Sequence, residues 1–293
     1  FQATRNAALQ AGLAVWLVIL GLSLVNYLLR YWRWAWYLQK LTRLDIPTRW
    51  HMAYYFCGFA LSTTPGKAGE TLRSLYLRRH GVSYRHSLST FFGERYLDLL
   101  SIVLLSSAAV FVFDGYAPLT LLIGLVALGA LWLLHSKTAL QALSSWSHRH
   151  PGRTGRTLAQ LLGLVQSSII LLRSRELFVG LLAGTIAWLA EAVGFWFLLR
   201  GLGQDVSVLM AVGIYSLAIL VGAISFLPGG LGSTEAVMAL LLVSAGIDKP
   251  VAIAATLICR IATLWFAVFL GLATMGLLAT RGVAPLPGRE VEA

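Results

Sequence analysis

The sequence predicts an all-α polytopic membrane protein, formed by an inverted repeat of transmembrane helices with two re-entrant helical hairpins. The first observation is composition: of 293 residues, 58% are hydrophobic and 12% are charged. A soluble core of this size does not bury so much apolar side chain. The second observation is a Pro-Gly break in each of two apolar stretches, and the third is that two pairs of landmark residues recur at similar spacing along the chain.

Five stretches are long and apolar enough to span a bilayer. A helix needs about 20 mostly apolar residues to cross the hydrocarbon region. We expect such spans at residues 8–29, 87–113, 118–135, 177–199 and 250–279. Residues 1–293 then form a single membrane domain, with a first repeat at 1–135, a connector at 136–176, a second repeat at 177–279 and a tail at 280–293.

Residues 51–80 and 206–245 each contain a Pro-Gly break, and we expect both to form re-entrant hairpins. Lipid cannot hydrogen-bond the backbone groups that a break frees, so a break persists only beside protein or a wet cavity. The tips permit tight turns and present helix amide groups that attract anions. The tip residues are Pro65, Gly66, Gly69, Pro228, Gly229, Gly230 and Gly232.

The connector at 136–176 is the most polar part of the chain. It mixes apolar residues with glutamines, serines and arginines, which favours an amphipathic helix at the cytoplasmic membrane surface. A short span at 158–172 is the alternative. The printed sequence starts at Phe1 rather than Met, so a further span upstream is also compatible with it.

Basic residues indicate the orientation. The net charge of +11 comes from 23 Lys and Arg residues against 12 Asp and Glu residues. Because cytoplasmic loops carry an excess of Lys and Arg, we interpret this charge as a topology signal and expect no nucleic-acid partner. The protein is then multi-pass in the cell inner (plasma) membrane, with cytoplasmic basic loops. These include Arg30, Arg33, Lys40, Arg43 and Arg49, beside an aromatic run at 31–37 that indicates an interfacial belt or a sugar or lipid platform. Lys67, Arg73, Arg78, Arg79 and Arg85 around the first hairpin belong to the same set of basic residues.

Two pairs of landmarks recur at similar spacing. Pro65 and Pro228 are 163 residues apart, and Arg95 and Arg260 are 165 residues apart. Three intervening spans, an odd number, give the two halves opposite orientation, so the hairpins open from opposite faces. In such inverted repeats the substrate site lies at the interface between the repeats.

Charged residues inside the predicted spans are candidate site residues. Glu94, Arg95 and Asp98 fall within one helical turn, and they form either a structural salt-bridge cluster or a functional site. Glu191 has no basic residue within four positions. We expect it to pair with Arg95 or Arg260, either of which also suits a lipid phosphate, while a protonated Glu191 bonded to a backbone carbonyl is the alternative.

The glutamates after the two tips have two possible roles. Glu70 and Glu235 either cap their own helices by accepting the free amide groups or contact substrate, and capping is the expected role for the side chains themselves. Arg73 lies three residues past Glu70, so we expect these two to pair.

Patterns for catalysis are absent from the sequence. No Ser-His-Asp, zinc, P-loop or dinucleotide motif occurs, and Cys57 and Cys259 lie far from any metal-ligand spacing. We therefore expect no catalytic residues, no metal and no cofactor, and a transporter rather than an enzyme.

Several of these motifs together resemble the flippase-like membrane family that includes the transmembrane domain of bacterial lysylphosphatidylglycerol synthases. The resemblance covers most of the chain and rests on Arg33-Trp34, Pro65-Gly66 through Gly69-Glu70 with Arg73, Glu94-Arg95 with Asp98, Glu191, Pro228-Gly229-Gly230 through Gly232 with Glu235, and Arg260. It implies translocation of a polar-headed lipid, with the matching charged residues near the headgroup path. The aminoacyl-transfer domain of the synthases has no counterpart after residue 279, so lipid synthesis is not implied.

The expected function is therefore that of a lipid flippase or scramblase. Its substrate would be a polar-headed lipid, anionic or linked to polyprenyl phosphate, and its partners would be membrane lipid and a lipid-modifying enzyme. The alternatives are a membrane enzyme subunit that presents lipid to a transferase, and a secondary carrier of small solutes or ions.

Overall fold

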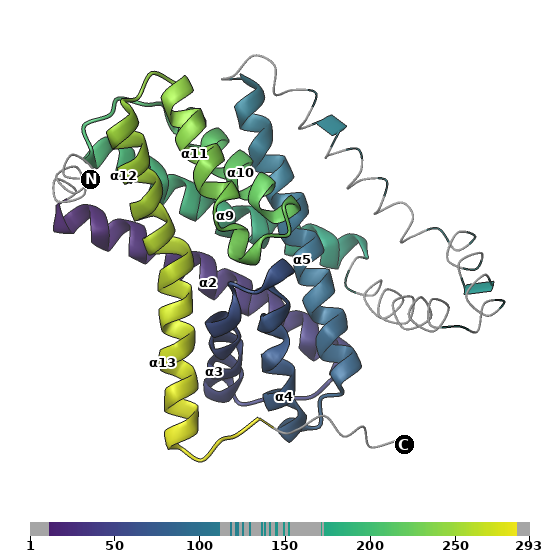
Figure 1. The fold of residues 1–293 in the computed structure, drawn as a ribbon. Coiled ribbons are helices and arrows are strands. Elements are labelled where there is room, and N and C mark those ends of the chain that lie inside the picture. The colour runs from purple at the N-terminus through teal and green to yellow at the C-terminus, as the bar shows by residue number, and fades with distance from the viewer. Residues whose placement is uncertain are drawn as a thin grey trace.

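The computed structural model describes residues 12–111 and 173–285 continuously, with isolated positions between them. Every regular element in this part of the chain is helical (Figure 1). Three helices there are long and apolar enough to cross a membrane: Leu13–Thr42, Ser174–Gly201 and Lys249–Thr280. The predicted all-helical membrane class is thus confirmed. The predicted span at 118–135, most of the connector and residues 286–293 lie outside the described residues.

The described elements follow the chain in a simple order. The first half contains α2 (Leu13–Thr42), α3 (Thr48–Gly58), η1 (Phe59–Leu61), η2 (Pro65–Leu72), α4 (Arg73–Leu77), η3 (Arg78–His80), α5 (Tyr84–Ser106) and η4 (Ser107–Phe111). The second half contains α9 (Ser174–Gly201), α10 (Val208–Ile224), η6 (Pro228–Gly230), α11 (Ser233–Ser244), α12 (Lys249–Arg260), the π-helical turn η7 (Ile261–Trp265) and α13 (Phe266–Thr280).

Helix α2 is longer than the sequence predicted. It continues to Thr42 and ends where Arg43 adopts a left-handed conformation and its N–H bonds Gln39 O at 2.7 Å. Arg30 and Arg33, expected in a cytoplasmic loop, therefore lie inside the helix and are 3% and 0% exposed. The predicted loop was wrong because the prediction ended the helix at the first charged residues. No proline or other helix breaker occurs between Gly21 and Pro47, so the helix continues.

The aromatic run on α2 is divided between two environments. Trp34 and Tyr37 are fully buried, whereas Trp32 is half exposed. Helical periodicity turns successive residues to different faces, so a continuous interfacial belt cannot form. The buried face of α2 packs against α9, which presents small residues to it and so allows close approach. These are Gly180, Gly184, Gly194 and Gly201, at each of which an added Cβ would lie within 4 Å of an atom of α2.

Both predicted Pro-Gly breaks interrupt helical structure. The first separates α3 and η1 from η2 and α4, and the second separates α10 from α11. In Figure 1 the α3 and α4 pair lies below the centre of the molecule and the α10 and α11 pair lies above it. The breaks meet there: a Cβ on Gly229 would lie 3.3 Å from Thr63 Cα.

Two apolar cores flank the meeting point. One joins α9, α10, α11 and α12, and the other joins α2, α3, α4 and α13. The outer surface is also apolar, with Phe178 and Phe269 each 67% exposed. Such exposed apolar side chains are expected where a protein contacts acyl chains.

Close packing of α13 on η1 generates the first prediction. A Cβ on Gly271 would lie 2.6 Å from the Phe59 carbonyl carbon, so Gly271→Ala should cost about 1–3 kcal/mol of stability through overpacking against backbone. Gly276, on the same helix, has no atom within 4 Å of such a Cβ, which makes Gly276→Ala the matched control. Thermal unfolding in detergent measures both, and equal midpoints would contradict this packing.

Candidate functional site

A buried ionic network joins α2, α4 and α5. Arg33 Nη2 donates to Asp98 Oδ1 at 2.5 Å, and Arg73 Nη2 donates to Glu94 Oε2 at 2.6 Å. Arg30 Nη2 lies 3.2 Å from Asp98 Oδ2. All of these side chains are at most 6% exposed. Buried charges require such pairing, because an isolated one loses its hydration without compensation.

Arg73 does not form the pair that the sequence predicted. Its guanidinium lies 4.6 Å from the ring centre of Trp34 and 4.8 Å from that of Tyr55, and it reaches Glu94 rather than Glu70. The Tyr55 hydroxyl donates to the other oxygen of Glu94 at 2.7 Å. The prediction was based on the three-residue spacing alone. In the structure Glu94 of α5 takes the guanidinium of Arg73, and Glu70 turns toward Ser62 and Arg95.

Glu70 faces its own break and Arg95. Its Oε1 accepts from the Ser62 hydroxyl at 2.9 Å, and its Oε2 lies 3.7 Å from Arg95 Nη2. The side-chain oxygen that accepts a backbone N–H of the η2 segment is Thr64 Oγ1, which bonds Gly69 N–H at 2.6 Å. The predicted capping role was therefore wrong for Glu70, because its carboxylate accepts from the Ser62 hydroxyl across the break rather than from a backbone N–H of its own segment.

The second break is held by Arg260 and Glu235. Glu235 Oε2 accepts the Gly232 N–H at 2.6 Å, so the predicted capping role is confirmed for this residue. Arg260 donates from Nε to Glu235 Oε1 and from Nη2 to Gly229 O, both at 2.6 Å. These bonds fix the tip and the first turn of α11 to α12.

Glu191 has a different partner from those expected. Its Oε2 accepts from the Tyr215 hydroxyl at 2.5 Å, and it is 5% exposed. Within the described ranges no cation lies within 4.0 Å of it. The predicted pair with Arg95 or Arg260 was wrong. Arg95 instead lies beside Glu70 and Asp98, and Arg260 pairs with Glu235. Nor is the partner a backbone carbonyl, as the alternative had it.

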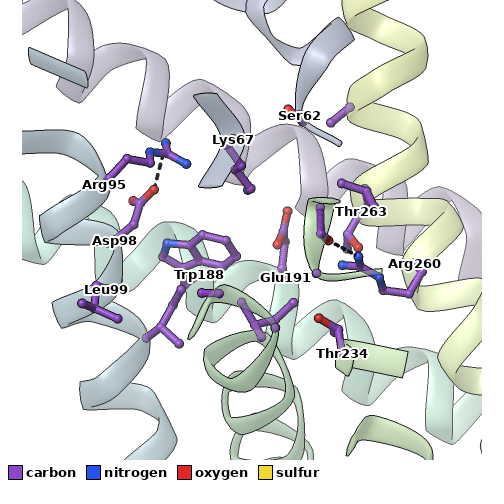
Figure 2. A pocket seen from close by; sticks show the side chains of 18 of the residues that line it. Ser62, Lys67, Arg95, Asp98, Leu99, Trp188, Glu191, Thr234, Arg260 and Thr263 are labelled. Carbon is purple, nitrogen blue, oxygen red and sulfur yellow. Dashed lines mark hydrogen bonds and ion pairs between the residues drawn. The ribbon is translucent and has the colours of Figure 1, made fainter. Parts of the chain in front are cut away.

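These groups surround a cavity of about 400 Å³ at the meeting point of the two breaks. Figure 2 shows Lys67, Trp188 and Glu191 directed toward its centre, with Arg95 and Asp98 on one side and Arg260 on the other. Of the predicted site residues, those that line it are Glu70, Arg95, Asp98, Glu191, Gly229, Gly230 and Arg260. Glu94, Arg73 and Glu235 instead hold the lining residues or their helices in place.

The mouth of the cavity is apolar. Ile224, Phe226 and Leu227 line the cavity and are also 46%, 73% and 45% exposed. Phe226 adopts a positive φ of 54° just ahead of Pro228, so the chain turns sharply at this edge. A molecule that enters here therefore passes exposed hydrocarbon before it meets charge.

Sequence reasoning missed several residues that line this cavity, among them Arg30, Lys67, Trp188 and Tyr215. Arg30 had a detectable signal, because Ser23, Asn26, Tyr27 and Arg30 recur at steps of three and four and mark one helical face. Lys67 was assigned to orientation alone. Trp188 and Tyr215 lie within apolar stretches of the sequence, and only the packing of the helices brings them beside charged groups. No cluster of metal-ligating side chains is present among the described residues.

Comparison with known proteins identifies the family. Residues 1–271 match the family described as "Lysylphosphatidylglycerol synthase TM region". The chain belongs to this family. The resemblance seen in the motifs is thus confirmed, and it extends through α12 into α13.

The relatives are archaeal membrane proteins. One from Methanothermobacter thermautotrophicus, described as a UPF0104 membrane protein, is 23% identical over 268 aligned residues, covering 83% of this chain and 79% of the relative. A UPF0104 membrane protein from Pyrococcus horikoshii is 24% identical over 245 residues, covering 74% and 73%. A second protein from Methanothermobacter thermautotrophicus is 28% identical over 231 residues, covering 73% and 69%.

The ionic network generates the second prediction. Arg33→Met leaves the buried Asp98 without its shortest ion pair, and we expect a loss of about 3–5 kcal/mol of stability. Lys40→Met removes the more exposed pair with Glu176 and should cost at most about 1 kcal/mol. Thermal unfolding of both variants in detergent gives the comparison. If the unfolding midpoints of the two variants shift equally, the buried ionic network does not stabilise the fold more than the exposed pair does.

Proposed function

We propose that this protein moves a polar-headed lipid, anionic or linked to polyprenyl phosphate, between the leaflets as a flippase or scramblase. The observation that carries the proposal is the cavity, which combines a charged interior with an apolar, exposed mouth at Phe226. The headgroup occupies the interior while the acyl chains remain against the mouth in the bilayer. Intramembrane charge in such a setting indicates a substrate path.

The chemistry of the lining supports an anionic headgroup. Arg30, Lys67 and Arg95 converge on one side of the cavity. Guanidinium and ammonium groups bind phosphate oxygens through charge-assisted hydrogen bonds. Membership in a family described by a lipid synthase's membrane region supports a lipid substrate rather than a soluble one.

The two breaks then act as re-entrant hairpins of an inverted repeat. Glu70 and Arg95 are separated by 25 residues, and Glu235 and Arg260 are also separated by 25 residues. In each half the glutamate after the break thus meets an arginine of a later helix. Equivalent contacts of this kind favour alternating access, in which one half rocks against the other around the cavity.

Two other functions compete with transport. An enzyme subunit would present the lipid to a transferase without net movement, and a secondary carrier would move a solute or an ion. The exposed apolar mouth favours lipid over a small solute, because a hydrated solute gains nothing from hydrocarbon at the entrance. We propose that a lipid-modifying enzyme, where it acts, is a separate partner.

The third prediction concerns Glu191. Glu191→Gln keeps the shape and the Tyr215 hydrogen bond but removes the charge that faces the cavity. We expect transport of a fluorescent phospholipid in reconstituted vesicles to slow by about tenfold or more. Thermal stability should stay within about 1 kcal/mol, because no ion pair is broken.

Asp248→Asn is the matched control, since this carboxylate is exposed at the start of α12 and lies outside the cavity lining. It should transport at the wild-type rate. Wild-type protein that moves no lipid would contradict the proposed function. Turnover of the lipid into a new product would favour the enzyme alternative, and a copurifying solute would favour the carrier.

The fourth prediction concerns orientation. If both units are re-entrant, Tyr84 beside the α3 and α4 pair and Asp248 beside α11 lie at opposite membrane faces. A membrane-impermeant maleimide should label Tyr84→Cys and Asp248→Cys from opposite sides, with the basic loops on the cytoplasmic side of the inner membrane. Native Cys57 and Cys259 are buried and give little background. Labelling of both variants from one side would contradict the inverted arrangement.

A further inference from the structure

Lys67 differs from the other cations that line the cavity. Among the described residues, Arg30, Arg95 and Arg260 each have a carboxylate within 4.0 Å, whereas Lys67 forms no such pair. Its Nζ lies 5.8 Å from the ring centre of Trp188 and extends toward the middle of the cavity (Figure 2). The ammonium group is thus directed at space that a ligand can occupy.

The backbone at Lys67 is also unusual. Its φ of 56° lies in the left-handed region, where a residue with a side chain is strained. The turn is fixed by the Lys67 N–H, which donates to Thr64 O at 2.9 Å. Glycine or asparagine would adopt this turn at lower cost, so a lysine here indicates that the side chain itself is used.

Unsatisfied donors surround the same space. The Nε and Nη2 atoms of Arg30 and of Arg95 are buried without a hydrogen-bond partner in the described structure. Their Nη2 atoms lie 3.2 and 3.0 Å from Asp98 Oδ2, close enough for attraction, but the groups are not aligned for hydrogen bonds. Buried donors left in this state are costly, and a ligand rich in acceptor oxygens satisfies them.

The local charges do not balance. Around this side of the cavity the cations are Arg30, Arg33, Lys67, Arg73 and Arg95, and the carboxylates are Glu70, Glu94, Asp98 and Glu191. Five cations against four carboxylates leave a surplus of one positive charge. In a medium of low dielectric constant this surplus requires an anion nearby.

We propose that Lys67, Arg30 and Arg95 form a binding site for the phosphate group of the transported lipid, with Lys67 as the residue that contacts it directly. The inference rests on the proposed function and identifies the part of the cavity that recognises the substrate. A phosphate group matches the site because it carries up to two negative charges and several acceptor oxygens. Glu191 faces the remainder of the headgroup.

A binding experiment on the purified full chain in an uncharged detergent tests this. The probes are dihexanoyl phosphatidic acid, a neutral glucosyl lipid with the same chains, and inorganic phosphate. We expect wild-type protein to bind the phosphate-bearing lipid about tenfold to a hundredfold more tightly than the neutral one. Lys67→Gln should abolish this preference without weakening the neutral lipid, and Lys67→Arg should retain it.

Lys249→Gln is the matched control, because it makes the same change at an exposed lysine outside the cavity. It should retain the preference. A preference that survives in Lys67→Gln, or that is lost equally in Lys249→Gln, overturns the inference. Inorganic phosphate that competes as well as the lipid would support the phosphate site and identify free phosphate as its ligand.

The outcomes for binding and for transport are separable. Phosphate-dependent binding without movement of lipid in vesicles would uphold this site and contradict the proposed function. Movement of lipid with no preference for phosphate would uphold the function and overturn this site.

Discussion

The pairing of buried charges is the constraint on which the structure depends. Glu94 and Asp98 on α5 are held by arginines from α2 and α4, so three separate helices are fixed to one another. Removal of one partner leaves a charge that the apolar surroundings cannot hydrate. The same constraint forces α2 to continue past the apolar stretch, because Arg30 and Arg33 reach their partners only from within the helix.

The two breaks are stabilised unequally. At the second break Arg260 bonds both the tip carbonyl of Gly229 and the carboxylate of Glu235, so its donors are engaged by protein. At the first break Arg95 lies 3.7 Å from Glu70 and is shared with Asp98. The first break therefore leaves unsatisfied donors beside the cavity, whereas the second break is held more rigidly because the donors of Arg260 are hydrogen-bonded to protein.

Polar interior and apolar mouth together explain why the cavity suits an amphiphile. The charged side draws on residues from α2, η2 and α5, while the mouth comes from the end of α10 and the turn after it. A headgroup and its acyl chains have these two opposite requirements in one molecule. At the break around Pro228 the chain passes from the exposed apolar mouth at Phe226 and Leu227 to the cavity lining at Gly229 within a few residues.

The sequence by itself determined the membrane class, the two helix breaks and the closeness of Glu94, Arg95 and Asp98, because composition, Pro-Gly turns and helical periodicity are local properties. Even the cap at Glu235 follows from residues three apart. The partners of Arg73, Glu191 and Arg260, and the burial of Arg30 and Arg33, were decided only by the tertiary structure. Charge attraction is not selective among carboxylates, so which pairs form depends on how α2, α5, α9 and α12 pack, and that information is spread over the whole chain.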